Sequence, residues 1–245
     1  MKENETAKVS NDILLEYYLE WSQNLDVELL KDAFSNPYYI KTPSDWWEKK
    51  YRIMIVGEEG AGGWGAGKTK WNPQTKDGIE KIMEYNSTQT YVQTVKRGEY
   101  WFGGEKYVLN NGQFWNRIRK ICDLSEDVTV VWNNIDKIHR LGNKGTKCKL
   151  TDKQRMLLHK ERILSKEIEI LQPTIVVFFG WHWRSLECEL PNIYDMVYQK
   201  YLENGSVPFR IEKNIFSLHP NAKKIGRTKA YGKKVLEQVK NLLTN

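Results

Sequence analysis

The sequence predicts an α/β fold of three layers (α/β/α), in which helices cover both faces of a central four-stranded, mainly parallel sheet. Four short apolar runs carry this prediction, at residues 51–57, 127–133, 173–180 and 214–220. The first three are rich in β-branched residues and nearly continuous, which is typical of strands buried on both faces of a parallel sheet. Segments with helical spacing lie between the runs, and such alternation of strands and helices indicates a three-layer domain.

The order of the elements predicts a helical lead and connector over residues 1–45, followed by a single α/β domain over residues 46–245. Residues 1–10 are polar and are expected to be disordered, with Asn11 as the N-cap of the helix that follows. The sequence predicts further helices over residues 113–124, 151–172 and 230–243, and Thr151 is the expected cap of the second of these.

Composition narrows the classes of partner. The chain carries 38 Lys and Arg against 31 Asp and Glu, a formal net charge of +7, which favours nucleic acid. Its three cysteines are widely spaced and form no C-x-x-C pair, so we expect neither a zinc ribbon nor a disulfide framework. We also expect no secretory signal, no membrane span and a cytoplasmic protein with reduced thiols.

Residues 62–69, GGWGAGKT, match the phosphate-binding P-loop pattern. A P-loop has its first glycine directly after a strand and its Lys-Thr pair at the start of a helix. Here Gly62 comes five residues after the run that ends at Gly57, and Pro73 lies where the helix is needed. We therefore expect no nucleotide cofactor.

Chemically useful side chains follow the predicted strands, where sites gather in open α/β sheets. Glu59 follows the first run, Asn134 the second, and His219 belongs to the end of the last. The neighbouring residues Glu58 and Asn133 are the alternatives. A carboxylate that activates water, an amide that reads a heterocycle and an imidazole that stabilises a leaving anion together suit bond cleavage.

Four segments in this order resemble motifs of the uracil-DNA glycosylase superfamily, with the closest pattern in its mismatch-specific thymine/uracil branch. They are "VGEEG", "NNGQFWNRIRKIC", "VVWNNIDK", and "QPTIVVFFG" followed by "SLHPN". The resemblance runs from about Tyr51 to Lys224. It implies a four-stranded parallel sheet and cleavage of the N-glycosidic bond of a base flipped out of DNA.

The resemblance also implies roles for the residues at the strand ends. Glu59, with Glu58 as the alternative, falls where the family positions the attacking water beside an oxocarbenium-like sugar. Asn134, with Asn133 as the alternative, falls at the base-reading amide. His219 falls at the imidazole that meets the departing base.

Further contacts with the substrate are implied in the same way. An aromatic ring normally stacks on the base, and Tyr107 matches the spacing of the thymine branch, with Phe102 and Tyr100 as alternatives. The residues expected to contact the DNA backbone are Asn221, Lys223, Lys224 and Arg227.

The chain departs from the family pattern at the base pocket. Gly60 stands where the motif has proline, and Ala61 stands where uracil-specific members have an aromatic that excludes substituents at C5. Asn221 replaces the serine of the last motif. The resemblance therefore implies a pocket open at C5 and removal of a modified pyrimidine, such as a hypermodified cytosine of phage DNA, leaving an abasic site.

A monofunctional mechanism is expected because only Lys68 lies near these strand ends as a candidate for a Schiff base. Two alternatives stay open: a uracil or mismatch repair glycosylase, and a DNA-binding module of the same fold without catalysis. We expect a monomer that binds DNA and needs no metal or organic cofactor; three cysteines cannot supply the four ligands of an iron–sulfur cluster.

Overall fold

The computed structural model describes residues 5–25, 35, 37–59, 71–96, 100–102, 105–107, 110, 112–141, 147–205, 207–217 and 225–244. The helices are α1 (Glu5–Gln23), α2 (Lys76–Tyr91), the π-helix η2 (Val92–Lys96), α3 (Gln113–Cys122), α4 (Asp152–Leu158), α5 (Ile163–Leu171), α6 (Trp183–Glu189), α7 (Pro191–Asn204) and α8 (Ile225–Thr244). The strands are β1 (Tyr51–Glu59), β2 (Tyr100–Phe102), β3 (Glu105–Tyr107), β4 (Val128–Asp136), β5 (Arg140–Leu141), β6 (Lys147–Cys148), β7 (Ile175–Phe179), β8 (Phe209–Ile211) and β9 (Asn214–Ser217).

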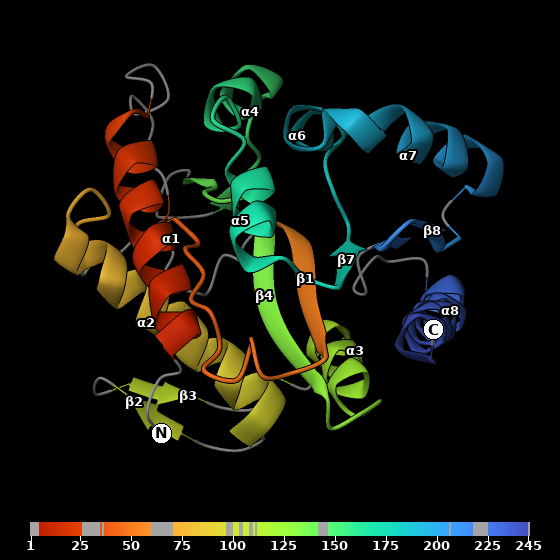
Figure 1. Cartoon of the computed structure of the whole chain (residues 1–245). Helices are drawn as coiled ribbons and strands as arrows, with labels where there is room; N and C mark the ends of the chain where they lie inside the picture. Colours follow the sequence, from red (N-terminus) through yellow and green to blue (C-terminus); the bar gives the residue numbers. More distant parts are fainter. Residues whose placement is uncertain are drawn as a thin grey trace.

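The central sheet has five strands in the order β4-β1-β7-β9-β8. The first four are parallel and coincide with the four predicted runs, so the α/β class and the mainly parallel sheet are confirmed. β1 lies between β4 and β7, which makes it a central strand (Figure 1). The strand pairs β2–β3 and β5–β6 form separate antiparallel hairpins.

The fifth strand, β8, was not predicted, so the expected four-stranded sheet was one strand short. β8 pairs antiparallel with β9 through a tight connection at Glu212 and Lys213. Glu212 adopts φ of 51°, a conformation that Gly or Asn usually supplies in such turns. Neither residue is a turn former by type, so the hairpin has no clear signature in the sequence.

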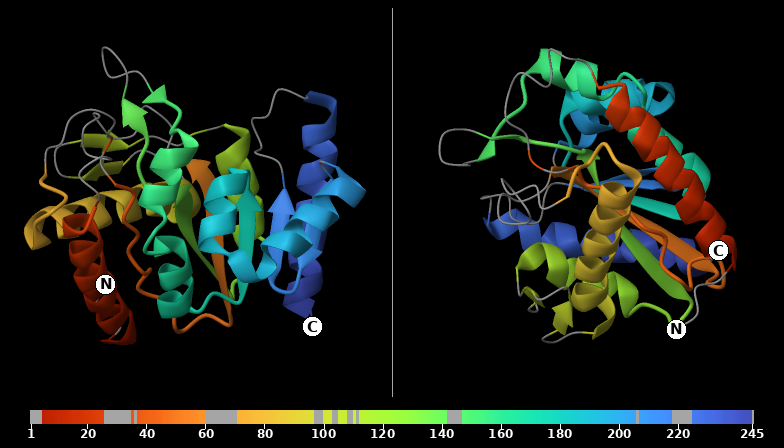
Figure 2. Two further views of the ribbon diagram at one scale, coloured as in Figure 1. Left: turned by 90° about the horizontal axis from the view of Figure 1, so that it is seen from above. Right: turned by 90° about the vertical axis from the view of Figure 1, so that its left-hand side faces the viewer.

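Two buried clusters lie on opposite faces of the sheet and give the three layers. Met54 and Phe178 belong to one cluster, with residues of α1, α2 and α5, whereas Ile53 and Val177 belong to the other, with residues of α3 and α8. Successive strand residues point to opposite faces of the sheet. Because both faces are buried here, the apolar runs in these strands are nearly continuous. Figure 2 shows α1 and α8 on opposite flanks of the sheet.

The first helix begins earlier than expected. α1 begins at Glu5, so the predicted disorder was wrong for residues 5–10, and so was the cap at Asn11. Asn11 is instead buried within the helix, where its Oδ1 accepts a hydrogen bond of 2.7 Å from the backbone N–H of Thr42. α1 therefore holds the connector in place. The domain boundary at residue 45 stays a prediction.

The predicted helix over residues 151–172 is two helices, α4 and α5. Thr151 caps α4 as expected, in a reciprocal capping box with Gln154. The chain then turns at Arg162, which has φ of 49° and precedes α5. The break changes the direction of the chain, so that His159 and Glu167 both become buried. No helix in the part of the chain that the structure describes is long and apolar enough to cross a membrane.

Candidate functional site

Residues at or near the carboxyl ends of the four parallel strands form one row across the sheet. Gly57 on β1 lies opposite Asn134 on β4 and opposite Phe179 on β7. Phe179 in turn lies opposite Ser217, the last residue of β9. Because all four strands are parallel, this row marks the carboxyl edge of the sheet, where ligands bind in folds of this class.

Asn134 carries an amide that is buried and unpaired. Its side chain is 1% exposed, and neither Nδ2 nor Oδ1 has a hydrogen-bond partner among the described residues. β4 continues to Asp136, so Asn134 lies two residues inside the strand and not at its end. An unpaired buried amide is costly, and such groups often mark functional positions.

Gly57 leaves the space that the Asn134 amide occupies. A Cβ atom at position 57 would lie 2.8 Å from Asn134 Oδ1, closer than such atoms approach in folded proteins. Any larger residue at position 57 would therefore force the Asn134 amide to move.

Asn133, the alternative base-reading residue, is fully occupied on the other side of β4. Its Nδ2 donates to Glu167 Oε2 at 2.8 Å, and its Oδ1 accepts hydrogen bonds from Lys137 Nζ and from the Asn134 backbone N–H. Glu167 also accepts a hydrogen bond of 2.6 Å from the Tyr18 hydroxyl. This amide holds the β4 backbone in place and has little capacity left for a ligand.

The charges of this cluster balance each other in the core. Lys137 Nζ lies 2.6 Å from Glu167 Oε2, and both side chains are fully buried. Burial lowers the pKa of Lys137 and raises that of Glu167, while their mutual attraction opposes both shifts. Removal of one partner would leave the other as an uncompensated buried charge.

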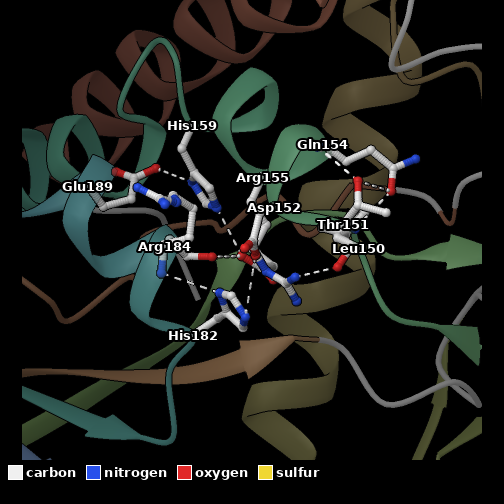
Figure 3. Close-up of polar contacts among 11 residues, drawn as sticks. Leu150, Thr151, Asp152, Gln154, Arg155, His159, His182, Arg184 and Glu189 are labelled. Carbon is white, nitrogen blue, oxygen red and sulfur yellow. Dashed lines mark hydrogen bonds and ion pairs between the residues drawn. The ribbon is translucent and has the colours of Figure 1, made fainter.

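A second buried cluster lies at the end of β4. Asp136 accepts hydrogen bonds from Arg155 Nε at 3.1 Å and from Ser185 Oγ at 2.6 Å. The ring of His159 bridges two carboxylates, with Nε2 2.9 Å from Asp136 Oδ1 and Nδ1 2.6 Å from Glu189 Oε1. Figure 3 shows His159 pointing toward Glu189, with Arg155 beside it.

These contacts fix the protonation of the cluster. Burial alone would lower the pKa of His159, but its hydrogen bonds to Asp136 and Glu189 and their charges raise it to about 9. Burial would likewise raise the pKa of Asp136, but His159, Ser185 and Arg155 lower it overall. At neutral pH the imidazolium therefore donates to both carboxylates, and Asp136 is committed to structural contacts.

The two carboxylates after β1 are placed differently. Glu58 is half-buried, and Glu59 is the last residue of the strand, where its backbone lies opposite Asp136. The side chain of Glu59 lies outside the described part of the structure. The choice of Glu59 over Glu58 as the reacting carboxylate stays a prediction.

The other predicted site residues are placed only in part. Tyr100 and Phe102 lie on β2 and Tyr107 on β3, with Tyr100 opposite Tyr107, but their side chains are not described. Arg227 belongs to α8, and its side chain is also not described. The predicted residues that lie outside the described residues altogether are Gly60, Ala61, His219, Asn221, Lys223 and Lys224.

A cleft of about 950 Å³ lies along β4. Residues 128–132 form its floor, and the connector from Tyr38 to Asp45 and helix α2 form its walls. Its lining includes Trp132 but not Asn134. Within the described ranges, no group of three His, Cys, Asp or Glu side chains is placed to hold a metal ion.

No protein-family model matches this sequence, and none of the curated proteins compared with it shows significant similarity. The candidate site therefore depends on the geometry of the strand ends and on the motifs they carry.

The His159 cluster predicts a specific dependence of stability on pH. The pKa of His159 is about 9 in the folded protein and 6.5 without these contacts, so its stabilisation is complete below pH 6.5 and is lost as the pH rises to 9. Urea unfolding should show a loss of about 3 kcal/mol over this range. His159→Gln should remove this slope, and a wild-type profile that is flat between pH 6.5 and 9 would contradict the assignment.

Replacement of the two adjacent asparagines should have unequal effects on stability. Asn133→Ala breaks contacts to a buried ion pair and should lower the free energy of unfolding by about 3 kcal/mol or more. Asn134→Ala removes an amide without partners and should change it by less than about 1 kcal/mol. Urea unfolding of both variants gives the comparison, and an equal loss in both would mean that the Asn134 amide is paired.

Proposed function

We propose that this protein is a monofunctional DNA glycosylase that hydrolyses the N-glycosidic bond of a modified pyrimidine. One observation carries the proposal: the unpaired, buried amide of Asn134 lies in register with Gly57 at the carboxyl edge of the sheet. The "VGEEG" segment brings a glutamate pair to the same edge. An amide and a carboxylate at this edge are the groups that base recognition and glycosidic hydrolysis require.

Each group has a distinct part in the proposed reaction. The Asn134 amide pairs with the flipped base, and the Glu59 carboxylate orients a water and stabilises positive charge on the sugar. The water oxygen bonds to the anomeric carbon, the glycosidic electron pair leaves with the base, and Glu59 accepts the water proton. His219 stabilises the departing base as an anion.

The charge of the chain supports a DNA substrate. The net charge is +7, and α8 presents Lys233, Lys234 and Lys240 at the surface. This helix follows the segment that holds Lys223 and Lys224, so its cations extend the same basic region along the chain. Lysines near a phosphate backbone provide affinity without sequence preference.

The choice of a C5-modified base depends on Gly60 and Ala61, which replace larger residues of the motif. A uracil or mismatch repair glycosylase uses the same amide and carboxylate with a narrower pocket. A binding module without catalysis would keep Asn134 and have no use for Glu59.

The experiment that tests the proposal measures abasic sites in DNA duplexes and single strands. The substrates contain uracil, a thymine mismatch, 5-hydroxymethylcytosine or glucosylated 5-hydroxymethylcytosine. Glu59→Gln should lower the rate of excision at least about a hundredfold, because it removes the charge beside the sugar. Glu58→Gln is the matched control and should keep most of the activity.

The outcomes separate the alternatives. Excision of a C5-modified base supports the proposal in full, whereas excision of uracil alone assigns the protein to repair and rejects the open pocket. DNA binding without abasic sites on any substrate would reject catalysis. Equal activity of Glu59→Gln and wild type would reject the role of Glu59.

A further inference from the structure

Trp132 carries a second buried polar atom without a partner close to the Asn134 amide. The residue is 6% exposed, and its Nε1 has no hydrogen-bond acceptor among the described residues. A Cβ atom at Gly57 would lie 3.7 Å from Trp132 Nε1 and 2.8 Å from Asn134 Oδ1. The indole N–H and the amide therefore lie around the same point above Gly57.

The position of this N–H is fixed by packing. Trp132 and Asn134 are two residues apart on β4, so both point to the same face of the sheet. The indole ring contacts Tyr38, Phe114 and Trp115, with ring centroids 4.6, 5.8 and 4.8 Å away. Neighbours on several sides hold the ring, so the donor keeps its direction when a ligand arrives.

The three unpaired atoms, Asn134 Nδ2, Asn134 Oδ1 and Trp132 Nε1, determine which hydrogen-bonding groups a ligand must present. Asn134 offers one donor and one acceptor to a planar ligand edge, and Trp132 adds a second donor. This total does not change if the amide oxygen and nitrogen are exchanged. A ligand that satisfies all three positions must present two acceptors and one donor.

On the Watson–Crick edge, pyrimidine bases meet this condition and purine bases do not. The pairing edge of uracil or thymine presents two keto oxygens and one N–H, and that of cytosine presents O2, N3 and an amino N–H. On the same edge, adenine and hypoxanthine each present one acceptor and one donor, and guanine presents one acceptor and two donors. A base flipped out of DNA exposes this same edge to the protein.

We propose that Trp132 is a specificity-determining residue of the site, whose Nε1–H donates to a keto oxygen of a flipped pyrimidine while Asn134 pairs with the rest of the edge. This inference rests on the proposed function and deepens it. It names a residue that distinguishes pyrimidines from purines whatever substituent C5 carries. A purine bound through its Watson–Crick edge leaves at least one of the three groups unpaired in a buried place.

The experiment follows the indole N–H directly, by nuclear magnetic resonance of protein labelled with ¹⁵N-tryptophan. The probes are free uracil, cytosine, adenine and hypoxanthine. The resonance of Trp132 is identified among the 10 tryptophans by its loss in Trp132→Phe and by through-space contacts with Phe114 and Trp115. The through-space contacts identify the Trp132 resonance even if the Trp132→Phe variant does not fold.

The expected result is that uracil or cytosine shifts the Trp132 resonance and that neither purine does. Trp132→Phe keeps an aromatic ring without the donor, so it should weaken pyrimidine binding about tenfold, the effect of one hydrogen bond. Trp47→Phe, beside Arg52 at the amino end of β1, is the matched control and should keep the wild-type affinity.

Pyrimidine binding with an unmoved Trp132 resonance would overturn the inference, and so would binding of none of the four bases. Abasic-site formation, measured in parallel, reports on the proposed function separately. Excision with an unmoved Trp132 resonance rejects the inference alone. A pyrimidine-specific shift without excision on any DNA supports the inference and rejects the glycosylase activity.

Discussion

The buried contact between Lys137 and Glu167 is the interaction on which the arrangement of the strand ends depends. Two full charges in a core are stable only when each is paired and hydrogen-bonded, and Asn133 completes the pairing from β4. The oxygen of the same amide accepts a hydrogen bond from the backbone N–H of Asn134. The ion pair thus connects α5 to the segment of β4 that carries the candidate site, and it fixes the backbone on which the site is built.

Asn133 and Asn134 are adjacent on a strand, so their identical side chains point to opposite faces of the sheet and have different surroundings. Asn133 faces the cluster with α5 and is fully hydrogen-bonded, whereas Asn134 faces the other layer and has an unpaired amide. The first residue provides rigidity and the second provides an open pairing capacity. Because the rigid residue precedes the open one directly, little conformational change is required when a ligand binds.

The sequence allowed the sheet to be predicted because burial on both faces leaves a strong pattern in β1, β4 and β7. It also placed Gly57 and Asn134 at one edge, since parallel strands end together. The β8 hairpin was missed because Glu212 is not a residue that usually marks a turn. The cluster of His159, Asp136 and Glu189 could not be predicted either, since its three residues come from three separate segments and such contacts have no local spacing. Charged residues after a buried strand, Asp136 and Lys137, were the only available sign.

The space above Gly57 has an evolutionary consequence. Residue 57 can gain a side chain only if the amide of residue 134 moves or is lost, so the two positions are coupled across β1 and β4. A lineage that lost its ligand would gain stability by filling this space with apolar groups, because nothing would then compensate the unpaired amide. A chain that retains both Gly57 and Asn134 keeps the unpaired amide in the place that the proposed function requires, and a chain that replaces either residue with an apolar one does not.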